Sequence, residues 1–217
     1  MVWQRARKPE QIEQRRLALL DAAAKLFEQQ GFDKVSLNAI ARAANISKAN
    51  IYRYFESREE LFLHLLLEDF DEWLNLLERE LAPLTGSEDD EAVARAIVTS
   101  MMTCPRLGTL MSVLGSVLER NVTVDIVVWF KTTLLGLTQR LLSGVQAALP
   151  TLSAEDTMQF VSTMYYLVAG MWHAGHPSPA VKEALERPEL TYACVDFEQQ
   201  LQRSLVTTLR GLRAAAR

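Results

Sequence analysis

A short stretch around residue 50 carries side chains that can read the edges of base pairs. Lys48 and Arg53 can donate hydrogen bonds to guanine, and Asn50 can form two hydrogen bonds with adenine. If Ile46 and Ile51 face a core, a helix over this stretch presents an outward set comprising Lys48, Ala49, Asn50, Arg53 and Tyr54. This mixture of a cation, an amide and an aromatic side chain is typical of a helix that lies in a DNA groove.

Two short helices separated by a tight turn are predicted to position these side chains. Ser36 can cap a first helix that runs to Ala44, and Ser47 can cap a second that runs to about Tyr54. Asn45 stands at the turn between them, where asparagine accepts a left-handed backbone more readily than most residues. In a helix-turn-helix the second helix enters the major groove and the first braces it, so the layout predicts a DNA-binding motif over 36–54.

The rest of the chain is also predicted to be helical. Apolar residues recur at three and four positions between Ser, Gly and Pro residues, and no segment shows the alternation of a strand. Gly31 ends a first helix from about residue 10, and Ser57 with Glu60 forms a capping box for a helix to about Leu81. Further helices are expected at about 87–103, 106–118, 122–148, 154–174, 178–186 and 195–213. The fold class is therefore all-α, with a three-helix domain over residues 1–56 and a larger helical domain over residues 57–217.

Composition favours a protein of the cytoplasm. The chain has 217 residues, of which 49% are hydrophobic, and its longest apolar runs fall short of the roughly 20 residues that span a bilayer. The basic first twenty residues contain no apolar run typical of a secretion signal. Cys104 and Cys194 fit a reducing compartment and are expected to pack as small apolar residues.

The charge is distributed unevenly along the chain. Residues 1–60 contain 11 Lys and Arg against 8 Asp and Glu, whereas residues 61–217 contain 12 against 19. A basic N-terminal part on a larger acidic body is compatible with phosphate binding at that end.

The N-terminal segment resembles the tetracycline-repressor (TetR) family of bacterial regulators. The residues that carry the resemblance are Ala22, Ala23, Leu26, Phe27, Gly31, Ile40, Ala41, Ala44, Asn45, Ile46, Ser47, Ile51, Tyr52, Arg53, Tyr54, Phe55, Ser57, Arg58 and Leu61. The resemblance covers about residues 12–62 and departs from the family at Asn45, usually Gly, and at Arg58, usually Lys. Both departures keep the physical role, since asparagine accepts the turn and arginine keeps the positive charge.

The resemblance implies a role for individual residues. It places four near bases, namely Asn38, Lys48, Ala49 and Asn50, and four on phosphates, namely Ser36, Tyr52, Tyr54 and Arg58, with Arg53 able to serve either role. The ring of Tyr52 can also pack beside Ile51. The basic arm from Arg5 to Lys8 either reaches the adjacent minor groove or stays a solvated tail, and the tail is favoured.

Methionines and aromatic residues on the middle helices suggest a small-molecule site within the ordinary core. Such side chains make adaptable apolar walls, and a few polar tips orient a ligand. The candidate lining is Met101, Met111, Trp129, Tyr165, Tyr166, Trp172 and His173. His173 and His176 have a spacing that can hold a metal, but no cysteine or carboxylate nearby completes a site, so no metal and no cofactor is expected.

Two apolar stripes could hold two copies of the chain together. One comprises Phe197, Leu201, Leu205, Leu209 and Leu212, and the other comprises Phe160, Met164, Leu167 and Met171. Either stripe could instead form the core of one chain. The family resemblance favours a homodimer in which these two helices and their copies form a four-helix interface.

The expected function is that of a DNA-binding transcriptional regulator, with repression as its default action. A small, largely apolar effector in the C-terminal domain would alter the binding of double-stranded operator DNA. No nucleophile elbow, phosphate-binding glycine loop or zinc-protease motif points to an enzyme. Two alternatives remain: an architectural DNA-binding protein that needs no ligand, and an enzyme that has kept a helical scaffold.

Overall fold

The computed structural model describes residues 9–215, and the basic arm from Arg5 to Lys8 lies outside them. In this part of the chain the regular elements are helices and no strand occurs, as the sequence pattern predicts. The chain divides into two compact units. The first unit comprises the residues up to Glu68 together with Leu114–Lys131, and the second comprises Asp69–Val113 and Thr132–Arg217.

The first unit contains the predicted helix-turn-helix. Its elements are α1 (Pro9–Gln30), the 3₁₀ turn η1 (Phe32–Lys34), α2 (Leu37–Ala43), α3 (Lys48–Ile51), the first part of α4 (Arg58–Leu81), the π-helical turn η3 (Leu114–Leu118) and the start of α7 (Val124–Ala148). The predicted boundaries at Gly31 and Asn45 are confirmed, because both residues have a left-handed backbone, with φ of 77° and 54°. Ser36 caps α2 by accepting a hydrogen bond from the amide of Ala39.

A capping box begins α4. The amide of Glu60 donates to Oγ of Ser57 at 3.0 Å, and the Glu60 carboxylate accepts from the amide of Glu56. The predicted capping pair is therefore confirmed, with the return bond made to Glu56, one residue before the N-cap.

Aromatic rings join α1, η1 and α4 in the first unit. The ring of Phe62 lies 6.1 Å from that of Phe27 and 5.0 Å from that of Phe32. Buried aliphatic residues fill the space around the rings: Leu19, Ala23, Val35, Ile40, Ile51 and Leu61. This core fixes α2 and α3 against α1, so the side chains predicted to read DNA stand on a packed support.

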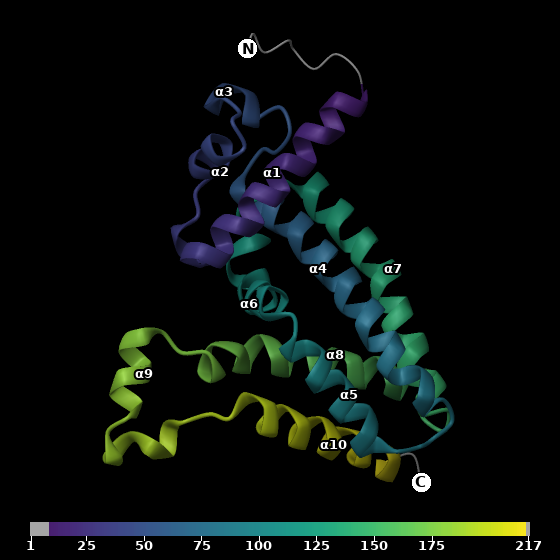
Figure 1. Ribbon diagram of the computed structural model, residues 1–217. Coiled ribbons are helices and arrows are strands. Elements are labelled where there is room, and N and C mark those ends of the chain that lie inside the picture. Colours follow the sequence, from purple (N-terminus) through teal and green to yellow (C-terminus); the bar gives the residue numbers. More distant parts are fainter. Residues whose placement is uncertain (1–8, 216–217) are drawn as a thin grey trace. The chain divides into compact units, whose positions relative to one another are not determined.

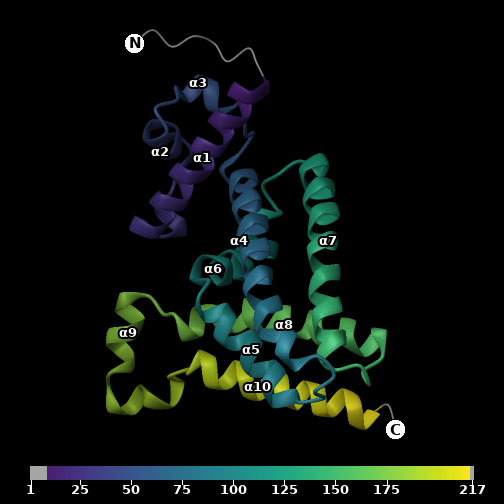
Figure 2. The ribbon, with the colours of Figure 1, turned by 45° about the vertical axis from the view of Figure 1, so that its right-hand side comes forward.

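The second unit is a helical body. Its elements are the rest of α4, η2 (Ala82–Leu84), α5 (Asp90–Met102), α6 (Pro105–Val113), the rest of α7, α8 (Ala154–Gly175), α9 (Pro179–Leu185), η4 (Pro188–Ala193) and α10 (Phe197–Ala215). Within it α8 and α10 run side by side, α5 packs on α10, and α6 packs on α8 (Figures 1 and 2). The segment with α9 and η4 connects α8 to α10 (Figure 1), and neither of its two helices has a buried residue.

Two predicted helices differ from the structure. The third helix is shorter than expected, since α3 ends at Ile51 and the residues up to Tyr54 form turns whose amides bond to Asn50 and Ile51. The helix expected over 106–118 changes at Leu114 from α-helix to a π-helical turn. Hydrophobic periodicity does not distinguish these related backbone forms, because their side-chain spacing is nearly the same over so few residues.

The leucine stripe of the last helix is core of the single chain, which makes its prediction as a dimer seam wrong. Leu201, Leu205 and Leu209 are each fully buried between α10 and its neighbours α5 and α8. On α8, Phe160 and Met164 are buried in the same way. A second copy of the chain therefore cannot pack against these buried side chains.

The described helices were also compared with the length and hydropathy of a membrane span. Within residues 9–215 no single helix is long enough and apolar enough to cross a membrane.

Candidate functional site

The helix-turn-helix presents the predicted base-reading residues to solvent. Ile46 and Ile51 are buried, as predicted. On the other side of the same short helix the exposed residues are Lys48, Ala49 and Asn50, followed by Arg53 in the next turn. Two buried isoleucines thus orient one cation and one amide outward from the same helix, as direct reading of a groove requires.

Residues around this helix complete a polar surface. Asn38 on α2 is exposed, and Arg42, in the last turn of the same helix, adds an exposed cation. Tyr52 follows α3 with 53% of its surface exposed, so its ring is not packed in the core and its hydroxyl is accessible. Tyr54 is half-buried, and its neighbour Phe55 anchors the turn in the core.

Arg58 differs from the other residues predicted to bind DNA. Its guanidinium donates to the carbonyl oxygen of Val35 at 3.0 Å and to Glu59 Oε1 at 3.0 and 3.2 Å. The same group lies 4.6 Å above the ring of Phe32. The structure thus places this side chain in contacts within the protein.

A half-buried histidine links three helices of the first unit. His64 on α4 receives the guanidinium of Arg16 from α1, with Nη2 2.9 Å from Nδ1, and its ring lies 3.9 Å from that of Trp129 on α7. Burial, together with the charge of Arg16, lowers the pKa of His64 to about 3. The imidazole is therefore neutral at neutral pH and can accept the arginine hydrogen bond.

The seven predicted ligand residues are distributed over both units. Trp129 belongs to the first unit, where it contacts His64, whereas Met101, Met111, Tyr165, Tyr166, Trp172 and His173 belong to the second. Met101 and Trp172 are buried, and Tyr166 is 68% exposed. The structure thus does not gather the seven side chains around one described cavity.

Trp172 and His173 connect α8 to α6. The indole Nε1 of Trp172 donates to Oγ1 of Thr109 at 3.0 Å, and Nε2 of His173 lies 2.9 Å from Oγ of Ser112. His176 stacks on the Trp172 ring at 4.0 Å. In residues 9–215 no group of three or more His, Cys, Asp or Glu side chains could hold a metal ion.

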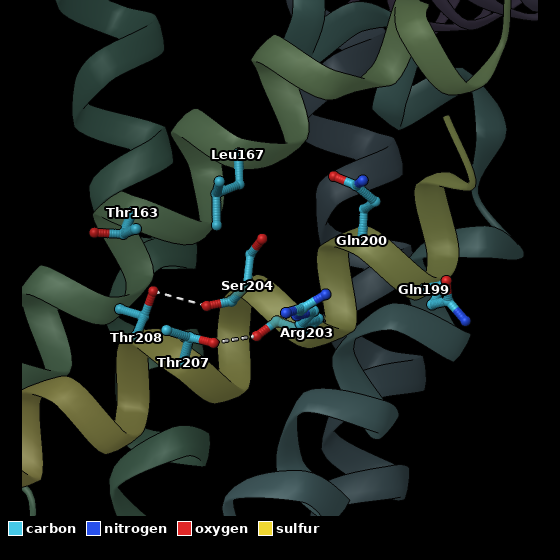
Figure 3. Close-up of a pocket in the computed structure, with 8 residues that line it drawn as sticks. All are labelled: Thr163, Leu167, Gln199, Gln200, Arg203, Ser204, Thr207 and Thr208. Atoms are coloured by element: carbon cyan, nitrogen blue, oxygen red, sulfur yellow. Dashed lines mark hydrogen bonds between the residues drawn. The ribbon is translucent and has the colours of Figure 1, made fainter. Parts of the chain in front are cut away.

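A polar groove runs between α8 and α10 on the second unit (Figure 3). It has a volume of about 560 Å³ and is lined by Thr163, Leu167, Gln199, Gln200, Arg203, Ser204, Thr207 and Thr208. Figure 3 shows Leu167 of α8 pointing toward the α10 side chains. The hydroxyls of Thr207 and Thr208 donate to the carbonyls of Arg203 and Ser204 along their own helix.

The sequence interpretation missed this groove. Gln200, Ser204 and Thr208 recur every fourth residue beside the buried leucines, so they form their own stripe on α10. The stripe is visible in the sequence. It does not by itself predict a groove, because small polar residues also occur on ordinary solvent-exposed faces of helices.

Known relatives resemble part of the chain. The HTH-type transcriptional regulator RutR of Escherichia coli K12 is 36% identical over 86 residues, which cover 40% of this chain and 37% of the relative. The HTH-type regulator HbdR of Aromatoleum sp. is 32% identical over 77 residues, 36% of this chain and 34% of the relative. The matched segments thus span little more than a third of these relatives.

Solved structures resemble nearly the whole chain. A possible TetR-family regulator from Streptomyces coelicolor A3(2) aligns with a TM-score of 0.58 at 16% identity, over 92% of this chain and 99% of that one. RolR, solved in complex with resorcinol, aligns with a TM-score of 0.55 at 19% identity, over 96% and 93%. At this identity the likeness shows a shared fold.

Family models match both parts of the chain. The model for bacterial regulatory proteins of the tetR family matches residues 19–65, and the model for the tetracyclin repressor-like C-terminal domain matches residues 67–216. The second alone covers more than half of the 217 residues. The chain therefore belongs to the tetracycline-repressor (TetR) family of bacterial regulatory proteins.

Proposed function

We propose that the chain binds operator DNA by inserting α3 into the major groove. The observation that carries this proposal is the outward position of Lys48, Ala49 and Asn50 opposite two buried isoleucines. Lys48, Ala49, Asn50 and Asn38 would contact bases, and Ser36, Tyr52 and Tyr54 would contact phosphates, with Arg53 available for either. In functional terms the DNA-binding part comprises residues 1–56 and the ligand-binding and dimerisation part comprises residues 57–217.

The active species in this proposal is a homodimer joined at the α8/α10 groove. A single helix-turn-helix buries little surface on DNA, and two heads can bind half-sites about one helical turn apart. The groove supports a self-complementary seam because Thr163, Ser204 and Thr207 supply small side chains that let two helices approach. No carboxylate lines it, so its only charge comes from Arg203.

A small, largely apolar effector is proposed to alter operator binding, with repression as the default action of the protein. The apolar and aromatic side chains of α5, α6 and α8 support this proposal, and the fold resembles that of RolR, which was solved with resorcinol. The candidate residues of the second unit remain the proposed lining of the effector site. Trp129, which belongs to the first unit, is instead a candidate fluorescence reporter. An effector needs only to bind one state of the dimer better than the other.

Two linked titrations test this function. A thermal-shift screen of small aromatic and aliphatic compounds identifies ligands, since an effector at 100 times its dissociation constant adds about 2.7 kcal/mol of stability. Fluorescence anisotropy of labelled operator then measures the DNA affinity with and without the ligand found in the screen. The factor by which the ligand changes operator affinity must equal the factor by which operator changes ligand affinity. A ligand that binds tightly and leaves operator affinity unchanged would favour an architectural role over a ligand-controlled switch.

A further inference from the structure

Arg58 stands at the first position of α4, beside the segment that leads into α2. Its side chain is 22% exposed, and the Glu59 carboxylate with which it pairs is 15% exposed. Nη1 donates to the carbonyl of Val35 at 3.0 Å and lies 3.5 Å from that of Phe32. Nε and Nη2 both donate to Oε1 of Glu59.

These contacts occupy most of the hydrogen-bonding capacity of the guanidinium. An arginine has five N–H donors in a planar fork. Here they are aimed at two backbone carbonyls and a carboxylate, and one face of the plane lies over the rings of Phe32 and Phe62. A phosphate oxygen would have to compete with Glu59, whose charge already neutralises the arginine.

We propose that Arg58 is a positioning residue for DNA reading and not a phosphate ligand. Val35 is 1% exposed, and its carbonyl directly precedes Ser36, the N-cap of α2. By holding this carbonyl, Arg58 fixes the start of α2, and α2 packs against α3. The side chain therefore stabilises the orientation of Lys48 and Asn50 without touching DNA.

This inference rests on the proposed DNA-binding function and changes the role that the family resemblance implies for one residue. A phosphate ligand contributes to specific and non-specific binding alike, and it adds about 0.9 to the slope of log K against log salt. A positioning residue contributes to specific binding and leaves that slope unchanged. The two roles thus predict opposite results in one titration.

The test measures the affinity of the full-length chain for its enriched operator and for a scrambled duplex between 50 and 300 mM KCl, by anisotropy. Arg58→Gln is expected to weaken operator binding by about tenfold, because a buried carbonyl loses its donor, while the salt slope and the scrambled-duplex affinity stay as in the wild type. Arg53→Gln is the matched control, since its exposed cation is expected to lower the slope by about one unit. A slope that falls equally in both variants would overturn the positioning role.

Arg58→Lys guards against a result caused by misfolding. Lysine keeps the charge but offers a single ammonium group, which cannot serve Val35 and Glu59 in one plane. Specific affinity is therefore expected to recover only in part, whereas complete recovery of affinity and specificity would favour the phosphate role.

Hydrogen exchange on the free protein separates failure of this proposal from failure of the proposed function. Arg58→Gln is expected to speed exchange of the Ile40 and Ala41 amides in α2 without DNA present. Unchanged exchange would contradict the positioning role of Arg58 even if operator binding weakened. A residue that contacts bases directly would also weaken operator binding without changing exchange in the free protein. If the wild type selects no DNA sequence at all, the proposed function fails, and the exchange result still decides whether Arg58 holds α2.

Discussion

At the scale of single residues, the proposed recognition of DNA rests on two side chains held outward by their buried neighbours. Ile46 and Ile51 flank the exposed residues of α3 and are buried, which leaves Lys48 and Asn50 no freedom to turn inward. Each can make specific hydrogen bonds to base edges worth roughly 1 to 3 kcal/mol of discrimination. Affinity and specificity should consequently change together at these positions.

Replacing either Lys48 or Asn50 by alanine is expected to cost about 1 to 3 kcal/mol on the operator and to relax preference at one or two base pairs. Competition binding against operators with single base changes measures both effects. Lys182→Ala, which removes an exposed lysine of the second unit, serves as a control whose affinity and base preference should match those of the wild type. Unaltered affinity and preference in both variants would remove α3 from the groove.

His64 makes the stability of the first unit depend on pH. Its pKa is about 3 in the folded chain, against about 6.5 for an unfolded histidine, because burial and Arg16 disfavour its charged form. Below pH 6.5 His64 therefore becomes protonated in the unfolded chain, whereas in the folded chain it stays neutral until the pH approaches 3. The contribution of this group to stability is complete above pH 6.5 and decreases as the pH falls toward 3.

The change that tests this is His64→Phe, compared with the wild type at pH 7.5 and pH 5. Urea midpoints of the wild type should fall between these values by more than those of the variant, since phenylalanine cannot titrate. Equal pH responses in His64→Phe and the wild type would show that His64 is not protected from protonation.

Residue-scale features were predictable from sequence where they depend on local backbone. The left-handed Asn45, the stop at Gly31 and the caps at Ser36 and Ser57 each follow from residues within four positions. The Arg16–His64 contact and the Arg58–Val35 bond join residues 48 and 23 positions apart. Periodicity carries no information on such pairs, so Arg58 kept the role implied by the family resemblance.

At the scale of secondary-structure elements, α10 carries two adjacent stripes with different environments. Leu201, Leu205 and Leu209 face α5 and α8, and the neighbouring stripe of Gln200, Ser204 and Thr208 lines the groove. A leucine repeat predicts that a helix face is covered, but it does not say whether the cover is the same chain or a second copy. That ambiguity explains why the sequence interpretation assigned to a dimer seam a leucine stripe that is core of the single chain.

Two variants on α10 should therefore behave differently. Leu205→Ala is expected to lose about 2 to 5 kcal/mol of unfolding free energy, because it leaves a cavity in a buried face. Thr207→Arg should keep the wild-type melting behaviour of the monomer and dissociate the dimer, since a long cation would fill the groove that we propose to hold the second copy.

Sedimentation velocity with thermal circular dichroism separates these effects. If Thr207→Arg folds and still dimerises with the affinity of the wild type, the dimer interface must lie on another face of the chain. A Leu205→Ala variant as stable as the wild type would contradict the burial of this residue.

The packing of α6 against α8 is expected to be sensitive to one added methyl group. A Cβ at Gly108 would lie 2.4 Å from the buried Trp172 ring, whereas a Cβ at Gly136 on α7 would meet nothing within 4 Å. Gly108→Ala is therefore expected to destabilise the chain by about 1 to 3 kcal/mol, and Gly136→Ala to stabilise it by up to about 1 kcal/mol. Urea unfolding of both variants checks the pair, and a neutral Gly108→Ala would mean that the two helices can separate at little cost.

At the scale of the whole molecule, the all-helical class and the family were predictable from sequence, whereas the position of the proposed effector site was not. Helix periodicity predicts the all-helical class, and the motif over residues 36–54 predicts the family. The family models agree with both predictions. A ligand site needs side chains from several helices in one place, and Trp129 shows how a residue of the right type can lie in a different unit from the other candidates. Only tertiary structure determines which methionines and aromatic residues share a wall.

Sequence-specific DNA binding by α3 is the central claim, and selection of DNA fragments tests it most directly. Purified full-length chain is mixed with random genomic fragments at physiological salt, and the bound DNA is sequenced beside that bound by a Lys48→Ala, Asn50→Ala double variant. The wild type should enrich a pseudo-palindromic sequence whose half-sites lie about one helical turn apart, and the double variant should lose that enrichment while retaining weak non-specific binding. Equal enrichment of the same sequence by both proteins, or no enriched sequence with the wild type, would contradict the account.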